Sequence, residues 1–468
     1  MSKVADDFGP RSFRIATLLA VPERFFLLIG LLTSVSFAIL FPPFSIADEP
    51  NHFYRAYAVS RGELGASLQP GRAGVVVPAS LHLMVRRLGG GYPPHRGWNA
   101  RAIAAALWWR LVPDKMEFVD CRSADQFTFV AYLPQAAAIA LGRAMGAPPL
   151  LLFYLARLGN LSVCLLLTYW AILLVPTYRW LFAMIALSPM AVCERASVSA
   201  DALTNAAAFM FIAAFVKVAF GSIDKISQRD FALCCLSSVL LSLAKPPYFL
   251  LTLAVLLIPK ERIPGTRRAT AIAAYVLILT IAIGYSLWTA TRVDVPLREG
   301  PDPVRQFQAT LLHPLHFIAL MFADYFIHCP RYVSQVIGIE LGWLDTRLPL
   351  LLVVAYLLVL CTLAIVDTNR SVHIELSSRV GLAAIVFSIL VLISASQFCV
   401  WTPFGANFIE GIQGRYFIPI LPIGALIFHS ARYGGLLMPS RTGFFLAAFS
   451  AVVWVVASFV IVSHFYGA

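Results

Sequence analysis

The sequence predicts an all-α polytopic membrane protein with about eleven transmembrane helices, within a range of about 10 to 13. Hydrophobic residues make up 59% of the 468 residues and charged residues only 13%. A soluble protein carries about 25% charged residues. Several segments are free of charge over roughly the 20 residues that a helix needs to cross a bilayer. In lipid a helix satisfies its own backbone hydrogen bonds, so these runs are typical of spanning helices.

The expected spans leave a short N-terminus and two large outer loops. Residues 1–24 are expected in the cytoplasm, and residues 25–290 form a membrane module that includes the outer loop 45–148. Residues 291–348 form the second large outer loop, and residues 349–468 hold the C-terminal membrane helices. The expected spans are 25–44, 149–174, 178–192, 202–220, 230–244, 246–258, 269–290, 349–366, 380–396, 416–430 and 442–464.

Neither outer loop contains a clean span. The apolar pieces of loop 45–148, around 100–111 and 127–144, are interrupted by charge or by proline. We therefore expect amphipathic helices that lie along the membrane surface. A semi-apolar piece at 313–328 is interrupted by Asp324 and is expected to be a surface or re-entrant helix; an extra crossing is the alternative.

The charges of the short connectors predict the orientation. The connectors 178–179, 225–229 and 260–268 are basic and are expected in the cytoplasm, because an excess of Lys and Arg marks cytoplasmic loops. Both large loops then lie outside. The expected location is the bacterial cytoplasmic (inner) membrane, with the active site facing the periplasm.

The first outer loop opens with two adjacent carboxylates, Asp48 and Glu49, where the chain leaves the first span. Pro50 suits the first turn of a helix. A helix from Asp48 places His52 at i+4 and Arg55 at i+7, so acid, imidazole and guanidinium share one face. The structural alternative is that Asp48 only caps the helix and Glu49 favours the positive end of its dipole.

More ionisable residues follow on the expected outer side. They are Glu194, Arg195 and Asp201 between two spans, Lys245 before two prolines, Asp345 in GWLDT, and Arg415 before Tyr416 in QGRYF. Each has an ordinary reading: Lys245 reaches the interface from a helix end, Arg415 anchors a helix to headgroups, and Asp201 caps a helix. Ionisable residues at membrane depth cost roughly 2.5–3.5 kcal/mol each and tend to be paired and functional.

Carboxylates and cations on one side of a membrane suit glycosyl transfer. A carboxylate can take the proton of an acceptor hydroxyl as that hydroxyl attacks the anomeric carbon of a sugar. Arg or Lys can hold the departing phosphate, whose charge grows as the glycosidic bond breaks. The sequence contains no Walker motif and no GxGxxG after a strand, so a lipid-linked donor is expected rather than a nucleotide-linked one.

The motifs FPPFSIADEPNHFYRAY, SVSADALTNA, LAKPPYF, GWLDT and QGRYFIPILP occur together in this chain. In this combination it resembles the GT-C class of membrane glycosyltransferases, in the bacterial branch called domain of unknown function 2142, over nearly its whole length. The resemblance implies a GT-C-like fold with Asp48 as the catalytic base. It also implies a second outer-loop acid at Asp201, which binds a metal in some related enzymes.

The expected function is an inverting glycosyltransferase that moves a sugar from a polyprenyl phosphate to a cell-envelope glycan or lipid. Asp48 is the expected base, and Glu49 orients it or substitutes for it. The expected substrate-binding residues are His52, Arg55, Arg195, Asp201, Lys245, Asp345, Arg415 and Tyr416.

No cofactor is certain; if a divalent metal binds, its candidate ligands are Asp48, His52 and Asp201. The net charge of +12 suits lipid headgroups and phosphate substrates rather than nucleic acid. A disulfide on the outer side is left open among Cys121, Cys193, Cys329 and Cys399.

Two other functions compete. An envelope polysaccharide polymerase or ligase depends on arginines in a late outer loop, and loop 291–348 supplies several. A lipid-glycan flippase or transporter needs charges along a path through the bilayer, whereas here the charges gather at one level.

Overall fold

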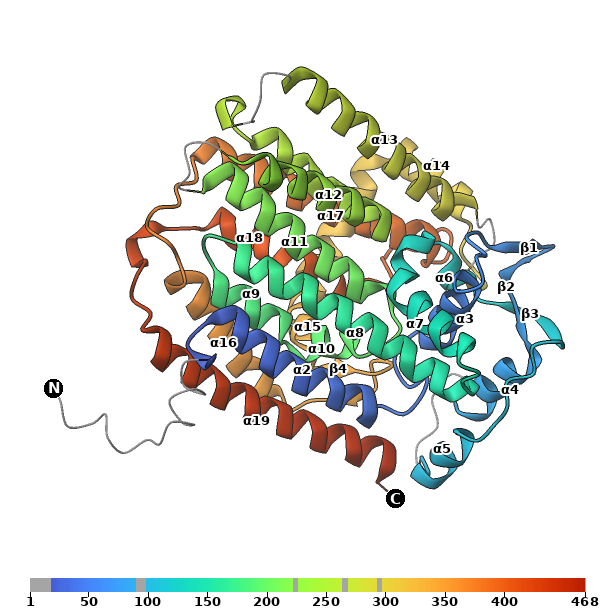
Figure 1. Ribbon diagram of the computed structural model, residues 1–468. Coiled ribbons are helices and arrows are strands. Elements are labelled where there is room, and N and C mark those ends of the chain that lie inside the picture. The colour runs from blue at the N-terminus through green and yellow to red at the C-terminus, as the bar shows by residue number, and fades with distance from the viewer. Residues whose placement is uncertain (1–17, 90–97, 222–225, 263–267, 293–296, 468) are drawn as a thin grey trace, which may run out of the picture.

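The computed structural model describes residues 18–89, 98–221, 226–262, 268–292 and 297–467. Long helices run side by side through its centre, and a small sheet lies at one end (Figure 1). Among the described residues, six helices are long and apolar enough to cross a membrane. They are α2 (Pro22–Leu40), α8 (Pro149–Leu174), α11 (Ala200–Phe220), α13 (Arg268–Arg292), α17 (Leu376–Val400) and α19 (Pro439–Tyr466). The protein is a helical multi-pass membrane protein.

The other helices in the membrane part are short or bent. Helices α14 (Pro303–Leu312) and α15 (Pro314–Ile337) qualify as one candidate span only together, and they meet at 105°. The count of eleven spans stays a prediction, since six helices, or seven with this pair, are long enough in the described part of the chain. The short helices are α9 (Arg179–Ala186), α10 (Pro189–Arg195), α12 (Gln228–Ala244), η2 (Pro246–Leu257), η3 (Lys260–Arg262), α16 (Leu350–Val366), η4 (Gly414–Ile420), α18 (Leu421–Ile427) and η5 (Ala431–Tyr433).

Prolines set several helix boundaries. The expected first span, 25–44, ends at Leu40, because Phe41 precedes a proline and adopts an extended conformation with ψ of 118°. The expected span 178–192 is divided into α9 and α10, and Pro189 occupies the first turn of α10. Prolines thus end or divide helices within apolar segments, so these helices are shorter than the spans predicted from the sequence.

The piece expected at 313–328 belongs to the longer helix α15. Asp324 does not interrupt this helix, because its carboxylate accepts hydrogen bonds from within the same helix. One comes from the Tyr332 hydroxyl at 2.8 Å, and the other joins it to His328 Nδ1 at 2.9 Å. The Asp324 side chain is buried.

The outer loop 45–148 contains a three-stranded antiparallel sheet, so the prediction of an all-α chain is wrong there. Strand β2 (Arg72–Pro78) pairs with β1 (Ser67–Gln69) on one side and β3 (Met116–Asp120) on the other. The β-branched run of three valines in β2 favours a strand. The helices of this loop are α3 (Glu49–Val59), α4 (Ala79–Arg87), α5 (Ala100–Ala106), α6 (Arg122–Asp125), η1 (Phe129–Tyr132) and α7 (Leu133–Ala144). In the second outer loop, β4 (Glu340–Leu341) pairs with β5 (Thr346–Arg347).

The two expected surface helices of this loop differ in their packing. Trp108, just after α5, is 86% exposed, as suits a residue at a membrane interface. Helix α7 instead packs on α8: a Cβ on Gly159 would lie 2.6 Å from the Pro134 carbonyl oxygen.

The two largest buried clusters among the described residues hold most of the molecule together. The larger one lies among the membrane helices and is centred on α11, which is 89% buried along its apolar stretch, against 22% for α13. The smaller one joins α3, β2, α7 and the start of α8 through residues such as Phe53, Val75 and Phe153. The N-terminal end of α3 therefore lies at the junction between the outer loop and the membrane helices.

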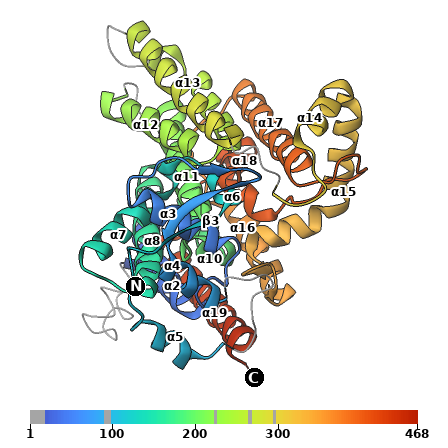
Figure 2. The same ribbon diagram turned by 90° about the vertical axis from the view of Figure 1, so that its right-hand side faces the viewer.

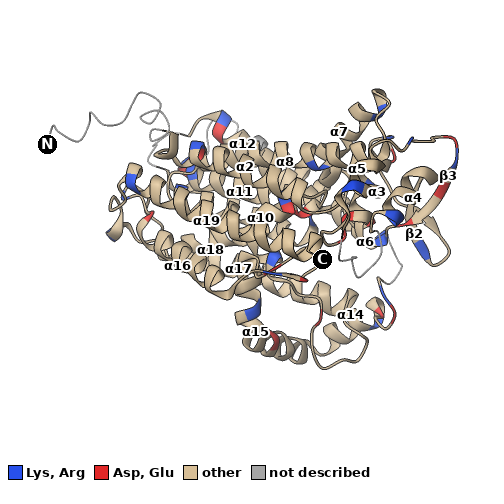
Figure 3. Cartoon of the chain, turned by 90° about the horizontal axis from the view of Figure 1, so that it is seen from below, with Lys and Arg blue, Asp and Glu red and all other residues tan. Residues whose placement is uncertain are grey.

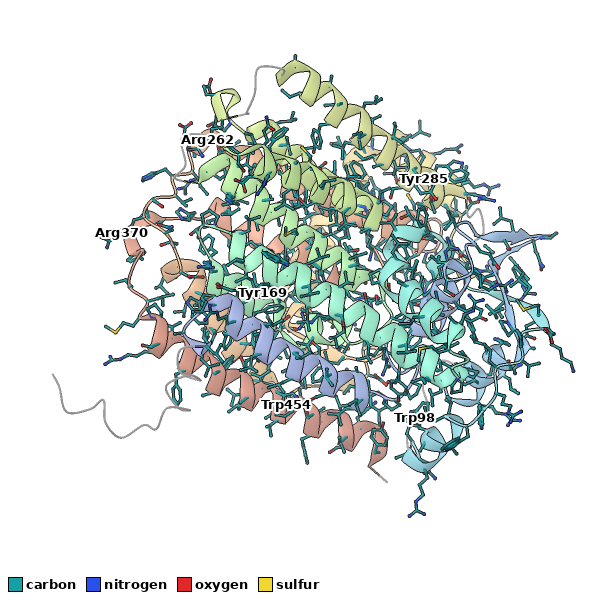
Figure 4. All side chains as sticks on the ribbon, in the orientation of Figure 1. Trp98, Tyr169, Arg262, Tyr285, Arg370 and Trp454 are labelled. Carbon is teal, nitrogen blue, oxygen red and sulfur yellow. The ribbon has the colours of Figure 1, made fainter. Side chains whose placement is uncertain are left out.

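Charged residues gather toward the ends of the helix bundle. In Figure 3 the long helices are tan over most of their length. Arg262 and Arg370, in loops expected in the cytoplasm, lie at one end, and Trp98 of the outer loop lies at the other (Figure 4). Trp98 donates its backbone N–H to the Phe465 carbonyl at the end of α19, at 2.8 Å. The predicted topology requires the expected cytoplasmic loops and the outer loop to lie at opposite ends of the bundle, as they do here.

Candidate active site

A cavity of about 330 Å³ lies where α3 and α6 of the outer loop meet the ends of several membrane helices. Figure 2 looks onto this end of the molecule, with α14 and α15 on the far side of α17 from α13. The volume is within the range of small-molecule sites, about 300–1,000 Å³. The ionisable and amide-bearing residues that line it are Asp48, His52, Gln126, Asp201, Lys245, Gln397, Gln413 and Arg415. Its apolar wall includes Phe127, Leu287, Leu297, Leu392, Ile393 and Trp401.

Asp48 lies at the position before α3 in the left-handed conformation, with φ of 59° and ψ of 4°. Asp and Asn tolerate this conformation better than most residues. The Asp48 side chain makes no capping hydrogen bond, so the interpretation of Asp48 as a side-chain cap is wrong. Instead its carboxylate is 40% exposed and lines the cavity, with Oδ2 lying 3.8 Å from Nη2 of Arg415.

Asp201 and Lys245 form an ion pair in the cavity wall. Lys245 Nζ lies 2.5 Å from Asp201 Oδ1, and each side chain is 14% exposed. Ser199, not Asp201, caps α11, because its side chain accepts the Asp201 backbone N–H. Lys245 joins α12 to η2, and its ammonium lies 4.7 Å from the ring centre of Tyr416. It therefore points into the cavity rather than toward lipid headgroups.

Arg415 connects the two carboxylates of the cavity. Its Nε lies 3.8 Å from Asp201 Oδ2, and its Nη2 lies at the same distance from Asp48. These distances are too long for hydrogen bonds, and the buried Nε has no hydrogen-bond partner within the described residues. Nε is sealed from solvent, whereas the two Nη atoms are not and also make no hydrogen bond within the described residues, so the Nη atoms hold the donors that a bound anion can use.

His52 lines the cavity one helical turn after Asp48, and its backbone N–H donates to the Asp48 carbonyl at 3.1 Å. Its Nδ1 lies 2.8 Å from the hydroxyl of Tyr132. Burial lowers the pKa of His52 to about 4, although the nearby Asp48 and Asp201 carboxylates act in the opposite direction. His52 is therefore neutral at physiological pH.

Glu49 lies outside the cavity lining, so the geometry favours the predicted orienting role over substitution for Asp48. It is fully buried and forms a two-pronged ion pair with Arg157 of α8, with contacts of 2.8 and 2.7 Å. Arg157 also donates to the Ala38, Phe41 and Pro42 carbonyls at the end of α2, at 2.7–3.1 Å. Arg157 thus ties the end of α2 to the first turn of α3, which holds Asp48 in place.

Arg55 does not reach the cavity either. It is fully buried, donates to the carbonyls of Glu63, Leu64 and Gly65, and pairs with Asp125 at 3.3 Å. Burial raises the pKa of Asp125 to about 6, against the opposing effect of Arg55. Although i+7 places Arg55 on the face of Asp48, the packing of α3 turns its side chain into the outer loop.

Arg195 and Asp345 also lie outside the cavity lining. Arg195 is buried, with Nε bound to Ser34 Oγ and Nη1 bound to the Ala186 carbonyl, both at 2.9 Å. Asp345 Oδ2 lies 3.1 Å from His464 Nε2, which connects the β4–β5 hairpin to the end of α19. The structure thus gives both residues contacts that hold helices and a hairpin together, and their assignment to substrate binding stays a prediction. Tyr416, in contrast, lines the cavity as expected.

A family model described as a predicted membrane protein (DUF2142) matches residues 31–424. The chain belongs to this family. The chain matches no curated protein and no solved structure. The matched range contains every cavity residue named above, from Asp48 to Tyr416.

The described part of this DUF2142 protein contains no group of three or more His, Cys, Asp or Glu side chains that could hold a metal ion. Asp48, His52 and Asp201 line one cavity, but they do not form such a group. All eight cysteines lie among the described residues and are free, so no disulfide joins Cys121, Cys193, Cys329 and Cys399.

Several features of the cavity were absent from the sequence prediction. Ser123, Gln126, Gln397 and Gln413 line it, but neutral polar residues in loops and helices carry no distinctive spacing. Arg157 did have a signal, because a charged residue in the middle of an apolar span is usually paired.

Proposed function

We propose that this DUF2142 protein is an inverting glycosyltransferase. It transfers a sugar from a polyprenyl-phosphate donor to a cell-envelope glycan or lipid on the outer face of the cytoplasmic membrane. The single observation that carries the proposal is that one cavity holds a half-exposed carboxylate, Asp48, together with two cations, Lys245 and Arg415.

The two cations suit a phosphate group. Lys245 and Arg415 together carry two positive charges; Asp201 lies against both cations, and Asp48 lies 3.8 Å from Arg415. The Nη donors of Arg415, which lines the cavity, favour the departing phosphate, whose charge increases as the glycosidic bond breaks. Apolar residues of α13 and α17, such as Leu287 and Leu392, line the same cavity and suit a lipid next to that phosphate.

Asp48 suits the role of general base. The acceptor hydroxyl gives its proton to the Asp48 carboxylate and forms a bond to the anomeric carbon. The bond from that carbon to the phosphate oxygen breaks, and its electron pair leaves with the phosphate. Attack on the face opposite the leaving group inverts the anomeric configuration.

Asp48→Asn tests the proposal. Asn accepts the left-handed conformation of residue 48 but takes no proton, so we expect transfer to fall by about 10²–10⁴-fold with folding intact. The assay is mass spectrometry of envelope glycans in cells that carry the wild type, the variant or no copy. Asp302→Asn is the control, because Asp302 begins α14 and does not line the cavity. Wild-type activity in Asp48→Asn would remove Asp48 from the mechanism.

The orientation is tested by cysteine labelling in intact cells, in a background without the native cysteines. Gln69 is exposed in the outer loop, and Arg370 is exposed in a loop that is expected in the cytoplasm. We expect an impermeant maleimide to label Gln69→Cys and not Arg370→Cys. The reverse pattern would place the cavity on the cytoplasmic side and reject the proposed donor.

The polymerase alternative has less support than the monosaccharide transferase. Its loop arginines pair with acids: Arg298 with Glu410, Arg305 with Asp302, and Arg331 and Arg347 with Glu340. None of these arginines lines the cavity. Comparison of a monosaccharide phospholipid with an oligosaccharide diphospholipid as donor separates the two reactions. Movement of labelled lipid without a glycosidic product would instead indicate a flippase.

A further inference from the structure

The hydrogen bonds of Tyr132 determine which nitrogen of His52 carries the proton. The Tyr132 oxygen lies 3.1 Å from the Ala124 carbonyl oxygen and 2.8 Å from His52 Nδ1. A carbonyl only accepts, so the single hydroxyl proton of Tyr132 lies on its contact with Ala124. The Tyr132 oxygen must then accept from His52, and Nδ1 carries the proton of the imidazole.

The other ring nitrogen, Nε2, is therefore an acceptor with a free lone pair. His52 is only 6% exposed, yet it lines the cavity. Within the described residues Nε2 has no hydrogen-bond partner, and it is not among the polar atoms sealed away from solvent. Since the ring is neutral and its tautomer is set by Tyr132, Nε2 can receive a hydrogen bond but cannot donate one.

Ser123 of α6 can donate a hydrogen bond into the cavity, whereas His52 Nε2 can only accept one. Its hydroxyl oxygen accepts a hydrogen bond from Asn51 Nδ2 at 2.7 Å, and Asn51 precedes His52 on α3. Among the residues that the structure describes, the Ser123 hydroxyl proton has no acceptor. Ser123 lines the same cavity, so it can donate to a bound molecule while Asn51 holds its oxygen.

Phe127 completes this side of the cavity. Its ring stacks on His52, with centroids 6.0 Å apart and planes 28° apart. Lys245 Nζ also lies near this ring, 5.4 Å from its centre. Phe127 thus contacts both the neutral His52 and the cationic Lys245 and offers an apolar wall beside two directed polar groups.

We propose that His52, Ser123 and Phe127 form the subsite for the acceptor, and that its ligand is a carbohydrate with neighbouring hydroxyls. One hydroxyl donates to His52 Nε2, and another accepts from Ser123. A phosphate or carbonyl oxygen cannot donate to Nε2, so the donor phosphate belongs at Lys245 and Arg415. This assignment rests on the proposed transferase function and gives the cavity an acceptor end and a donor end.

His52 acts in this subsite as a binding residue, and the acceptor proton still goes to Asp48. His52→Asn tests it, since the Asn amide can keep the donor to Tyr132 while Nε2 is lost. The probe is the glycan fraction isolated from cells that lack the protein, titrated as acceptor, with membranes of those cells as the source of donor.

We expect the acceptor KM to rise by about 10-fold in His52→Asn and in Ser123→Ala, and the KM for donor to rise less. Ser123→Ala is the milder change, because Ser123 is only half-buried. In ¹⁵N-histidine spectra of the whole protein, the wild type should have His52 protonated at Nδ1, and Tyr132→Phe should mix the tautomers.

An unchanged acceptor KM in both variants, or a wild-type ring protonated at Nε2, would overturn the subsite and leave the transferase intact. Absence of any transfer by the wild type would overturn the proposed function and, with it, the subsite.

Discussion

Replacement of Arg157 by alanine is the sharpest test of how the fold holds Asp48. Arg157 and Glu49 are both fully buried, and their two contacts of 2.8 and 2.7 Å join α8 to the first turn of α3. Without Arg157, the Glu49 carboxylate keeps, among the described residues, only the backbone N–H of Val198, at 3.2 Å. Removing one partner of a buried ion pair costs about 3–5 kcal/mol. The three carbonyls at the end of α2 lose their donors as well.

The measurement is the free energy of unfolding of the purified protein in detergent, together with transfer activity. We expect Arg157→Ala to lose about 3–5 kcal/mol, and Arg157→Lys to lose less because lysine keeps a charge but cannot make both contacts to Glu49. The double variant Glu49→Leu/Arg157→Met should recover much of the stability, because replacing a buried pair with apolar residues is often neutral. It should not recover activity, since the turn at Asp48 loses its tie to α2.

A loss below about 1 kcal/mol in Arg157→Ala would refute this reasoning, since a surface pair contributes no more than that. Full activity in the double variant would show that the pair stabilises the protein without positioning Asp48. Arg179→Ala is the matched control: its pair with Glu23, at 2.9 Å, is partly exposed and lies away from the cavity.

Three further predictions concern the cavity. Lys245→Ala and Arg415→Ala should each raise the KM for donor more than that for acceptor; equal effects on both would reject the phosphate assignment. Gly411→Ala should reduce activity, because residue 411 has φ of +88° and a Cβ there would lie 2.5 Å from Gln397 Oε1. An unaltered rate would show that Gln397 and the backbone at residue 411 can adjust without changing the cavity. Since burial holds the pKa of His52 at about 4, below its unfolded value of 6.5, unfolding takes up a proton between these values. Stability should fall by about 3 kcal/mol as the pH drops from 6.5 to 4, and His52→Asn should lack this component in denaturant titrations.

The sequence alone predicted much of the membrane architecture. Long apolar runs give helices whatever surrounds them, because backbone groups in lipid must be satisfied within the segment, and α2, α8, α11, α13, α17 and α19 lie where the runs do. Proline positions also bound the helices, as at Phe41 before Pro42. The three-stranded sheet escaped prediction because its strands are short and because residues 79–115 separate β2 from its partner β3.

The residues expected in the cavity also divide into those that the sequence placed correctly and those whose position depends on the tertiary structure. The sequence by itself identified Asp48, His52, Asp201, Lys245, Arg415 and Tyr416 as site candidates, because charged and aromatic residues at the expected outer ends of apolar segments are few, and all six line the cavity. Only the tertiary structure decided that Glu49, Arg55 and Arg195 turn away from the cavity. The direction of each side chain depends on partners from distant segments, such as Arg157 for Glu49. Helical spacing predicts the helix face on which a residue lies. The final direction of a charged side chain depends on its partners, because a buried guanidinium or carboxylate is stable only when it is paired.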